Sequence, residues 1–249
     1  MVDVRDVGLE SVNFSFVEVH PGHEAAFNRW YERDHFYAGG VLGPGVISGR
    51  RWYSPKRLRD VRYVGDTCPF PDPTVGTNLA TYFFTPPSGG DEFRDWVTPQ
   101  LAELRQQGRM FAERTPVNIG FYTFDQVVDL PGAIDIEPHI ALDRPFGAVI
   151  ATFAAGGVGA PASGSVPDGT FTLGCTWKPQ PAIVAQPDLT PFAPVRLLLT
   201  FVRDAPEPDA AALAAVATTA AHAAGATAMW ASAFLPVIPG SDGFVEELR

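Results

Sequence analysis

The segment VNFSFVEVHPGHEAAFNRWYERDHF, residues 12–36, decides the fold. Its first nine residues are rich in β-branched and aromatic side chains that partly alternate with polar ones, which predicts a half-buried strand. The Pro21-Gly22 pair then predicts a turn. Beyond the turn, four side chains recur at i, i+3, i+4 and i+7: Phe27, Trp30, Tyr31 and Asp34. This spacing places the aromatic rings on one face and predicts an amphipathic helix over residues 23–36.

The rest of the first half extends this strand and helix into a larger unit. Strands are predicted over residues 46–53, 77–85 and 116–124, and a second helix over residues 91–107. Pro99 is expected to kink or restart that helix, with Thr98 as its N-cap. The resulting order, β-α-β-β-α-β, is that of a ferredoxin-like, split βαβ unit. Such a unit leaves one sheet face without helices, so another layer must cover it.

The second half repeats this order incompletely. Strands are predicted over residues 146–154, 170–177, 195–202 and 227–235, and an Ala-rich helix over residues 209–224. Where the other helix belongs, the chain has GGVGAPASGSVPDG, residues 156–169, which holds too much glycine, serine and proline for a stable helix. We interpret this segment as a flexible loop and a candidate lid.

These segments predict an α+β protein of two fused ferredoxin-like units in a dimeric-α/β-barrel-like arrangement, with the second unit eroded. The first unit spans residues 1–130, a proline-punctuated linker spans 131–145, and the second unit spans 146–249. A chain of 249 residues with 46% apolar side chains is sufficient for a core of that size. The sequence leaves open whether the units pair with each other or with a second chain in a homodimer.

Composition and charge narrow the class of partner. The 18 basic and 28 acidic residues give a formal net charge of −10, so nucleic acid is not expected as a partner. No apolar run is long enough to span a membrane, and no basic-then-apolar leader begins the chain, which predicts a cytoplasmic protein. Cys68 and Cys175 lie in different halves without a neighbouring ligand, so neither a disulfide framework nor a metal site is expected.

The most informative residues for chemistry lie at the end of the first helix. Tyr31 and His35 are four positions apart, so their side chains lie one turn apart and could act on one ligand. A histidine titrates near neutral pH, which suits it to move a proton. Asp34 could orient the imidazole only through a bend at the helix end. The alternative is a structural histidine stabilised by the negative end of the helix dipole.

Together with GPGVISGRRW, residues 43–52, this helix resembles EthD-like members of the dimeric α/β-barrel superfamily. The family pattern is an aromatic-Tyr pair, a His shortly afterwards, and then PGV…RRY. It matches Trp30-Tyr31, Asp34-His35, Pro44-Gly45-Val46 and Arg50-Arg51-Trp52. Gly108-Arg109-Met110 and the strand after it resemble the end of the same unit, so the match covers about the first half of the chain. The sequence departs from the family after His35, where Phe36-Tyr37 stands in place of a nearby proline.

The resemblance implies an apolar pocket between sheet and helices that takes a small hydrophobic, oxygenated aromatic or polyketide-like molecule. It further implies a cofactor-independent cyclase, dehydratase or decarboxylase, which is a lyase-type enzyme without metal or organic cofactor. His35 would be the general acid/base, and Tyr31 would donate a hydrogen bond to a substrate oxygen. The other expected substrate contacts are Trp30, Asp34, Arg51, Tyr82 and Tyr122.

Strand geometry limits which arginine joins this pocket. Arg50 and Arg51 are neighbours on a strand and point to opposite faces, so at most one is expected to enter the pocket and stabilise an oxyanion. The alternative is a solvated arginine whose stem packs on Trp52. Tyr82 and Tyr122 are also consistent with core residues whose hydroxyls reach the edge.

Other functions remain open under the same resemblance. One is a cofactorless monooxygenase acting on electron-rich phenols, and another is a non-catalytic small-molecule-binding or stress-related protein. The superfamily also includes haem-binding peroxidases and chlorite-decomposing enzymes with a helical histidine ligand. The candidate here, His222, lies nine residues after Leu213, about 180° around the helix from the start of its buried stripe. It is expected to face water, so neither haem nor another cofactor is predicted.

Overall fold

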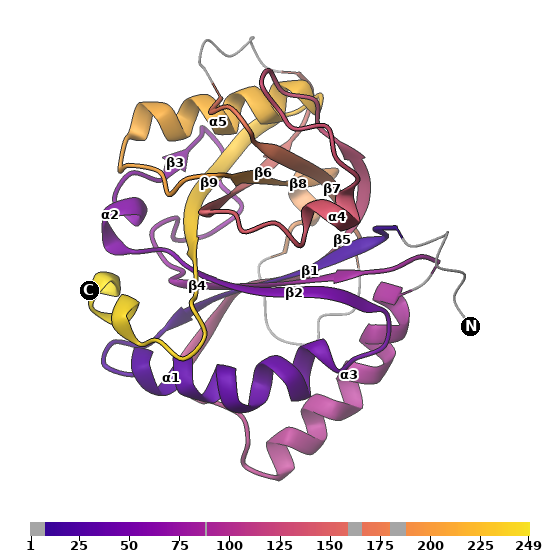
Figure 1. Ribbon diagram of the computed structural model, residues 1–249, viewed down its shortest axis with the longest axis vertical. Coiled ribbons are helices and arrows are strands. Elements are labelled where there is room, and N and C mark those ends of the chain that lie inside the picture. The colour runs from indigo at the N-terminus through magenta and orange to yellow at the C-terminus, as the bar shows by residue number, and fades with distance from the viewer. Residues whose placement is uncertain (1–7, 88, 159–165, 180–187) are drawn as a thin grey trace.

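The computed structural model describes residues 8–87, 89–158, 166–179 and 188–249. Within these residues, eight antiparallel strands close into a barrel, and helices pack on its outside (Figure 1). The first half contributes β1 (Ser11–Val19), β2 (Val46–Tyr53), β4 (Asn78–Phe84) and β5 (Arg114–Val127). The second half contributes β6 (Ala148–Ala155), β7 (Phe171–Trp177), β8 (Val195–Val202) and β9 (Thr227–Pro236). The predicted α+β class is confirmed at this level.

The two halves of the chain meet at two junctions of the barrel. The strands follow the order β2-β4-β1-β5-β7-β8-β6-β9, and β9 pairs again with β2. At the first junction, β5 and β7 form five residue pairs between Tyr122 and Val127 of β5. At the second, only Trp52 and Tyr53 of β2 pair with β9. A short strand, β3 (Tyr63–Val64), also lies beside β9.

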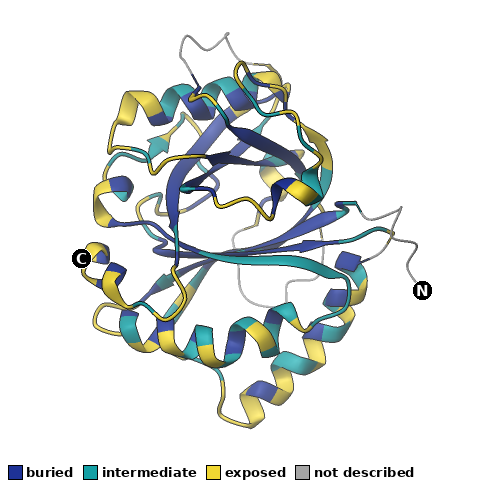
Figure 2. Ribbon diagram, viewed as in Figure 1, coloured by how far each residue is buried: buried dark blue, intermediate teal, exposed yellow. Residues whose placement is uncertain are grey.

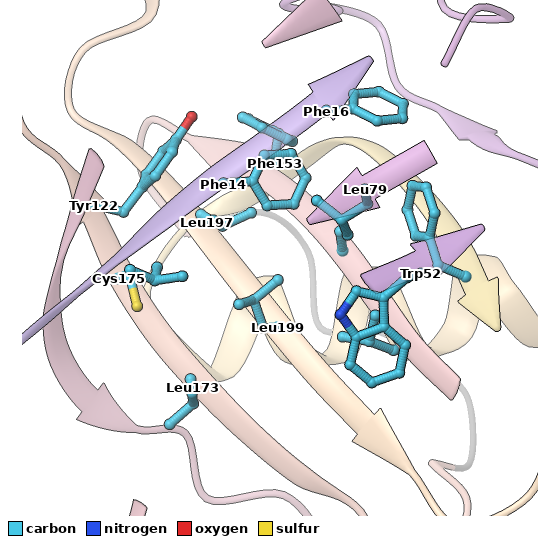
Figure 3. Packing of buried hydrophobic residues seen from close by; sticks show 14 of the residues in the cluster. Phe14, Phe16, Trp52, Leu79, Tyr122, Phe153, Leu173, Cys175, Leu197 and Leu199 are labelled. Carbon is cyan, nitrogen blue, oxygen red and sulfur yellow. The ribbon is translucent and has the colours of Figure 1, made fainter. Parts of the chain in front are cut away.

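Aromatic and aliphatic side chains from both halves fill the barrel. Successive residues of a strand point to opposite faces, so Phe14 and Phe16 of β1 point inward together. The Phe14 ring packs edge-on against Phe153 at 5.6 Å, and Phe16 packs edge-on against Phe234 at 5.5 Å. Figure 3 shows this packing, with Trp52 in the same cluster. Burying each such ring stabilises the fold by roughly 1.5–3 kcal/mol.

The helices form separate outer layers on the two halves. α1 (Glu24–Trp30) and α3 (Gly89–Gln106) lie along the first half, and α5 (Ala210–Ala223) lies along the second (Figure 1). Each helix is buried toward the sheet and exposed on its outer side (Figure 2). The Asp209 carboxylate caps α5 by accepting hydrogen bonds from two of its first amides.

The first helical segment is longer than predicted. α1 is followed by two π-helical turns, Tyr31–His35 and Tyr37–Val41. The Phe36 amide donates to the Tyr31 carbonyl, and the Leu42 amide donates to the Tyr37 carbonyl, which is the i to i−5 pattern of a π-helix. The helical segment therefore continues to residue 41 and does not end at Phe36.

The second helix is continuous where a break was predicted. α3 contains Pro99 in its interior, and Thr98 is not an N-cap. The Thr98 hydroxyl donates to the Arg94 carbonyl at 2.9 Å, as serine and threonine often do inside helices. Packing of the apolar side of α3 on the sheet thus stabilises the helix by more than it loses from the hydrogen bond that Pro99 cannot donate.

Several short elements lie in segments that were predicted only as connections. They are α2 (Lys56–Arg59), β3, α4 (Pro138–Ala141) and two 3₁₀ turns, Thr190–Phe192 and Gly243–Leu248. The described parts of the glycine-rich segment, 156–158 and 166–169, contain no helix. The candidate lid otherwise lies outside the described residues. Nowhere in the described ranges is a helix long and apolar enough to cross a membrane.

Candidate functional site

A small polar cavity of about 60 Å³ lies between the first helical segment, α3 and the outer face of the N-terminal strands. Its polar wall comes from four elements and consists of Asn13, Ser15, Tyr31, His35, Tyr82 and Arg114. Asn13 of β1 pairs with Tyr82 on β4 and with Phe121 on β5. Because paired residues point to the same face, all three side chains point outward, toward the helices. We refer to this space as the polar cavity.

The first π-helical turn brings Tyr31 and His35 to this cavity. The two residues are only 4% and 8% exposed. Their rings lie almost perpendicular to each other, with centroids 5.2 Å apart. The predicted juxtaposition of Tyr31 and His35 is therefore present, although it is made by a π-helical turn, a conformation often found at functional sites.

Trp30 fixes the orientation of the imidazole. The Trp30 and His35 rings are stacked, with 4.3 Å between centroids and 18° between planes. The indole Nε1 donates a hydrogen bond to the Arg109 carbonyl at 2.7 Å, which holds the indole in place. Trp30 thus contacts His35 rather than the open part of the polar cavity.

Two glycines allow the rings to pack against the helix. A Cβ at Gly39 would lie 2.6 Å from His35 Cε1, and a Cβ at Gly40 would lie 2.3 Å from Tyr82 Cε1. Both distances are shorter than any normal carbon contact, so only glycine fits at these positions. Gly39 and Gly40 thus leave the space that the His35 and Tyr82 rings occupy.

The imidazole of His35 is neutral at physiological pH. Its pKa is lowered to about 3, mainly by burial and secondly by the nearby positive charge of Arg114, against a weaker opposing effect of Asp34. The Nδ1 atom is buried and has no hydrogen-bond partner in the part of the chain that is described. His35 can therefore donate or accept a hydrogen bond in the polar cavity, but it carries no charge there.

Two phenols, those of Tyr31 and Tyr82, also line the polar cavity. The hydroxyls of Tyr31 and Tyr82 lie 3.1 Å apart and share a hydrogen bond. Burial raises the pKa of Tyr82 well above its usual value, and the neighbouring Tyr31 adds to this effect. One hydroxyl donates to the other, so a single O–H of the pair is available to a ligand.

Arg114 is the cationic residue of the polar cavity, and sequence reasoning missed it. It lies at the start of β5, before the strand predicted from residue 116, so no pattern linked it to the helix. Its guanidinium lies 5.1 Å from the Trp30 ring centroid and forms no ion pair with any described residue. Burial lowers the pKa of Arg114, but an arginine side chain keeps its proton in proteins and so it remains charged.

Arg51 lies on the other side of Tyr31, with its guanidinium 4.7 Å from the ring centroid. It donates to the Asn28 side-chain oxygen at 2.8 Å and pairs with Glu32 at 3.6 Å. With Arg50, it lines a separate cleft of about 460 Å³, beside the point where β2 meets β9. Both arginines line this cleft, although at most one was expected to reach a pocket. Neither lines the polar cavity.

Two other predicted contacts lie outside the polar cavity. The Asp34 carboxylate pairs with the Arg109 guanidinium, which lowers the pKa of Asp34, and so it does not orient the imidazole. Tyr122 pairs with Val12, on the opposite face of the sheet from Asn13. Its ring lies inside the barrel beside Phe14, and its hydroxyl donates to Asn118 at 3.0 Å (Figure 3).

Comparison with known proteins identifies the fold but no closer relationship. No family model matches the sequence, and no curated protein matches it. A solved structure of a candidate chlorite dismutase is similar over 93% of this chain and 96% of its own, with a TM-score of 0.50 and 11% identity. A candidate dyp-type peroxidase from Shewanella oneidensis covers 92% of each chain at 8% identity, but its TM-score of 0.47 is too low to support an argument.

These comparisons support a ferredoxin-like α+β fold and correct two predictions. The EthD-like subgroup is not confirmed, because the similar solved structure is that of a candidate chlorite dismutase. The predicted cofactor-independent cyclase, dehydratase or decarboxylase is wrong, since that structure is not of an enzyme of this kind. The local match around His35 indicated the fold without indicating the reaction.

Neither His222 nor His35 forms a haem site in the described part of the chain. His222 of α5 is half-buried with its Nδ1 enclosed, so the prediction that it faces water is wrong. It lies six residues, or about 9 Å of helix, beyond Val216, where a cavity beneath α5 ends. That cavity is lined by no histidine, cysteine, methionine or tyrosine among the described residues. His35 lines only the polar cavity, which is far too small for a porphyrin.

Proposed function

We propose that this protein binds a small oxygen-bearing anion, such as a short carboxylate, in the polar cavity. The observation that carries the proposal is Arg114, a half-buried guanidinium without an ion-pair partner among the described residues. A guanidinium partly withdrawn from water loses hydration, which a group of opposite charge or a set of acceptors can compensate. An anion in the polar cavity supplies that compensation.

The neutral groups around Arg114 suit an anion as well. The Tyr31–Tyr82 pair has one O–H left for a ligand after its shared hydrogen bond, and the unpaired Nδ1 of His35 can donate when it carries the ring proton. No carboxylate lines the polar cavity in the described chain, so no negative side chain there repels an anion. The guanidinium, the free phenol O–H and the imidazole are donors of the kind that hold an oxyanion. The rest of the lining consists of Asn13, Ser15, Gly39 and the apolar side chains of Phe93, Val97, Leu101, Met110, Ile119 and Phe121.

The size of the polar cavity sets the size of the ligand. A single water requires roughly 10–15 Å³ of such space, so about 60 Å³ accommodates only a few non-hydrogen atoms. Formate, acetate and nitrite are of that size, whereas an aromatic acid is not. The polar cavity is therefore too small for the hydrophobic aromatic molecule expected from the sequence.

Isothermal titration calorimetry with formate and acetate tests this proposal. We expect saturable binding of both anions and none of the neutral analogue formamide. Arg114→Gln should abolish the binding, whereas Arg109→Gln, which removes an exposed arginine outside the polar cavity, should leave it intact. Equal heats for formate and formamide, or undiminished binding by Arg114→Gln, would refute the proposal.

We also infer that the barrel consists of two related split βαβ units. The strand order β5-β1-β4-β2 of the first half corresponds element by element to β9-β6-β8-β7 of the second. In the first unit a helical segment follows the first strand and another follows the third, whereas in the second unit the described residues form only α5. The polar cavity lies in the first unit, which has a helical segment at both of these positions.

A further inference from the structure

A second cavity, of about 210 Å³, lies beneath α5 on the outer face of the second half. Its floor comes from α5 and from the strands below, and includes Ile150, Val202, Leu213, Val216 and Ala233. All five of these residues are at least nine-tenths buried. Leu58 of α2 forms one side. We refer to this space as the α5 cavity.

The α5 cavity exists because α5 is the only long helix on this half. The outer face of the first half is covered by two helical segments, while the described chain places α5 and the four-residue α2 on the second. The segment after β8, residues 203–209, bridges α5 and α2. Its Pro206 carbonyl accepts a hydrogen bond from Arg57 of α2 at 3.4 Å. An apolar floor thus remains accessible below a short connecting segment.

The mouth of the α5 cavity is acidic. Asp168, Asp204, Glu207 and Asp209 line it, with Arg203 as the single basic residue. The first three carboxylates form no ion pair with a described residue, and all are exposed. Asp209 caps α5, so the other three carboxylates are free to meet a ligand. An apolar floor beneath unpaired carboxylates matches a molecule with an apolar body and a positive charge at one end.

We propose that the α5 cavity binds a small amphipathic amine, with its apolar part on the Ile150, Val202 and Val216 floor and its ammonium group at the Asp204 and Glu207 carboxylates. This site is separate from the polar cavity. It lies on the opposite half of the chain and has the opposite charge preference. Transfer of the apolar part from water supplies the main favourable term, at roughly 25 cal/mol per Å² of buried surface.

Calorimetric titration with three probes of equal chain length tests the proposal: octylamine, octanol and octanoate. We expect octylamine to bind more tightly than octanol, and octanoate to bind least, because the carboxylates at the mouth attract only the ammonium. The octylamine affinity should fall as salt is added. Equal affinities for octylamine and octanol would refute the role of the carboxylates. A preference for octanoate would refute the proposal altogether.

Two pairs of variants locate the binding on this cavity. Ala212→Leu narrows the mouth from an exposed position on α5, whereas Ala211→Leu adds the same side chain next to it and outside the lining. Only Ala212→Leu should weaken octylamine binding. Glu207→Gln should weaken it by roughly two- to five-fold, the usual worth of one exposed ion pair, whereas Asp66→Asn should not. Full octylamine affinity in both Ala212→Leu and Glu207→Gln would overturn the assignment.

Discussion

The imidazole of His35 lies flat on the indole of Trp30, with the ring centroids 4.3 Å apart. A protonated imidazole in this position would gain a cation–π attraction of at most about 2 kcal/mol. Burial and the charge of Arg114 nevertheless lower the His35 pKa from 6.5 to about 3, which corresponds to roughly 5 kcal/mol against the charged form. The stack therefore holds a neutral ring.

The low pKa of His35 predicts that acid destabilises the protein. Below pH 6.5 the unfolded chain binds a proton at this residue, whereas the folded chain does not until about pH 3. The free energy of unfolding should therefore fall by up to about 1.4 kcal/mol per pH unit, or roughly 2 kcal/mol between pH 6.5 and 5. Urea unfolding at several pH values measures this slope.

His35→Gln isolates this contribution, because glutamine does not titrate. The slope of the unfolding free energy between pH 6.5 and 5 should decrease in this variant, because about one proton fewer is bound on unfolding. His23→Gln, at an exposed site, controls for the general effect of removing a histidine. An unchanged slope in His35→Gln would show that the folded protein protonates this imidazole readily.

Gly39→Ala should disturb the ring stack. Its methyl group would lie 2.6 Å from His35 Cε1, so the imidazole must shift from its present position on Trp30. We expect a loss of about 1–3 kcal/mol in the free energy of unfolding and a change in tryptophan fluorescence. Gly157→Ala is the matched control, because a Cβ there meets no atom within 4 Å. Equal stability of the two variants would contradict the close packing at Gly39.

The two buried tyrosines on opposite faces of the sheet should respond differently to loss of the hydroxyl. Tyr82→Phe removes the bond to Tyr31, and Tyr122→Phe removes the bond to Asn118. Each should cost about 1 kcal/mol of stability. Only Tyr82→Phe should weaken formate binding, since Tyr122 lies inside the barrel. Titration calorimetry on both variants measures this difference, and equal formate affinities would place Tyr82 outside the anion site.

Arg62 should be a strong determinant of stability. Its guanidinium donates to the carbonyls of residues 73–76 and to Ser232, and lies 5.2 Å from the centroid of Trp230. Burial, together with the charge of Arg59, lowers its pKa to about 9. Arg62→Gln should reduce the free energy of unfolding by at least about 3 kcal/mol, measured by urea denaturation. The exposed Arg57→Gln should cost less than about 1 kcal/mol, and a similar loss in both would contradict this role.

All eight barrel strands were predictable, because each is a mainly apolar run of strand length that lies between segments rich in glycine or proline. The error that mattered was at the start of β5. Pro116 indicates the first residue of a strand, but the register shifts beside it, opposite Phe16 and Val17, and pairing continues to Arg114. A bulge depends on the partner strand and leaves no signal in the local sequence, so Arg114 was missed.

Strand alternation and strand pairing also explain which site residues could be predicted from the sequence. The alternation in β1, with Phe14 and Phe16 apolar and Asn13 and Ser15 polar, indicates which face meets the helices. The register of β1 with β4 and β5 would then have shown that Tyr82 and Tyr122 point to opposite faces of the sheet. That register cannot be read from the sequence of a single strand. The π-helical turns were not predictable, because they result from rings that pack against Gly39 only in the folded protein.

The junction between β2 and β9 has a consequence for how the barrel opens. It consists of Trp52 and Tyr53 with their two partners, whereas β5 and β7 join over five pairs. Breaking the shorter junction leaves one continuous sheet whose order from β2 to β9 is unchanged. The molecule is therefore a rolled sheet with a single weak edge-to-edge closure. The amides at the junction of β2 and β9 should exchange before those of the other barrel strands, at a free energy below that of global unfolding.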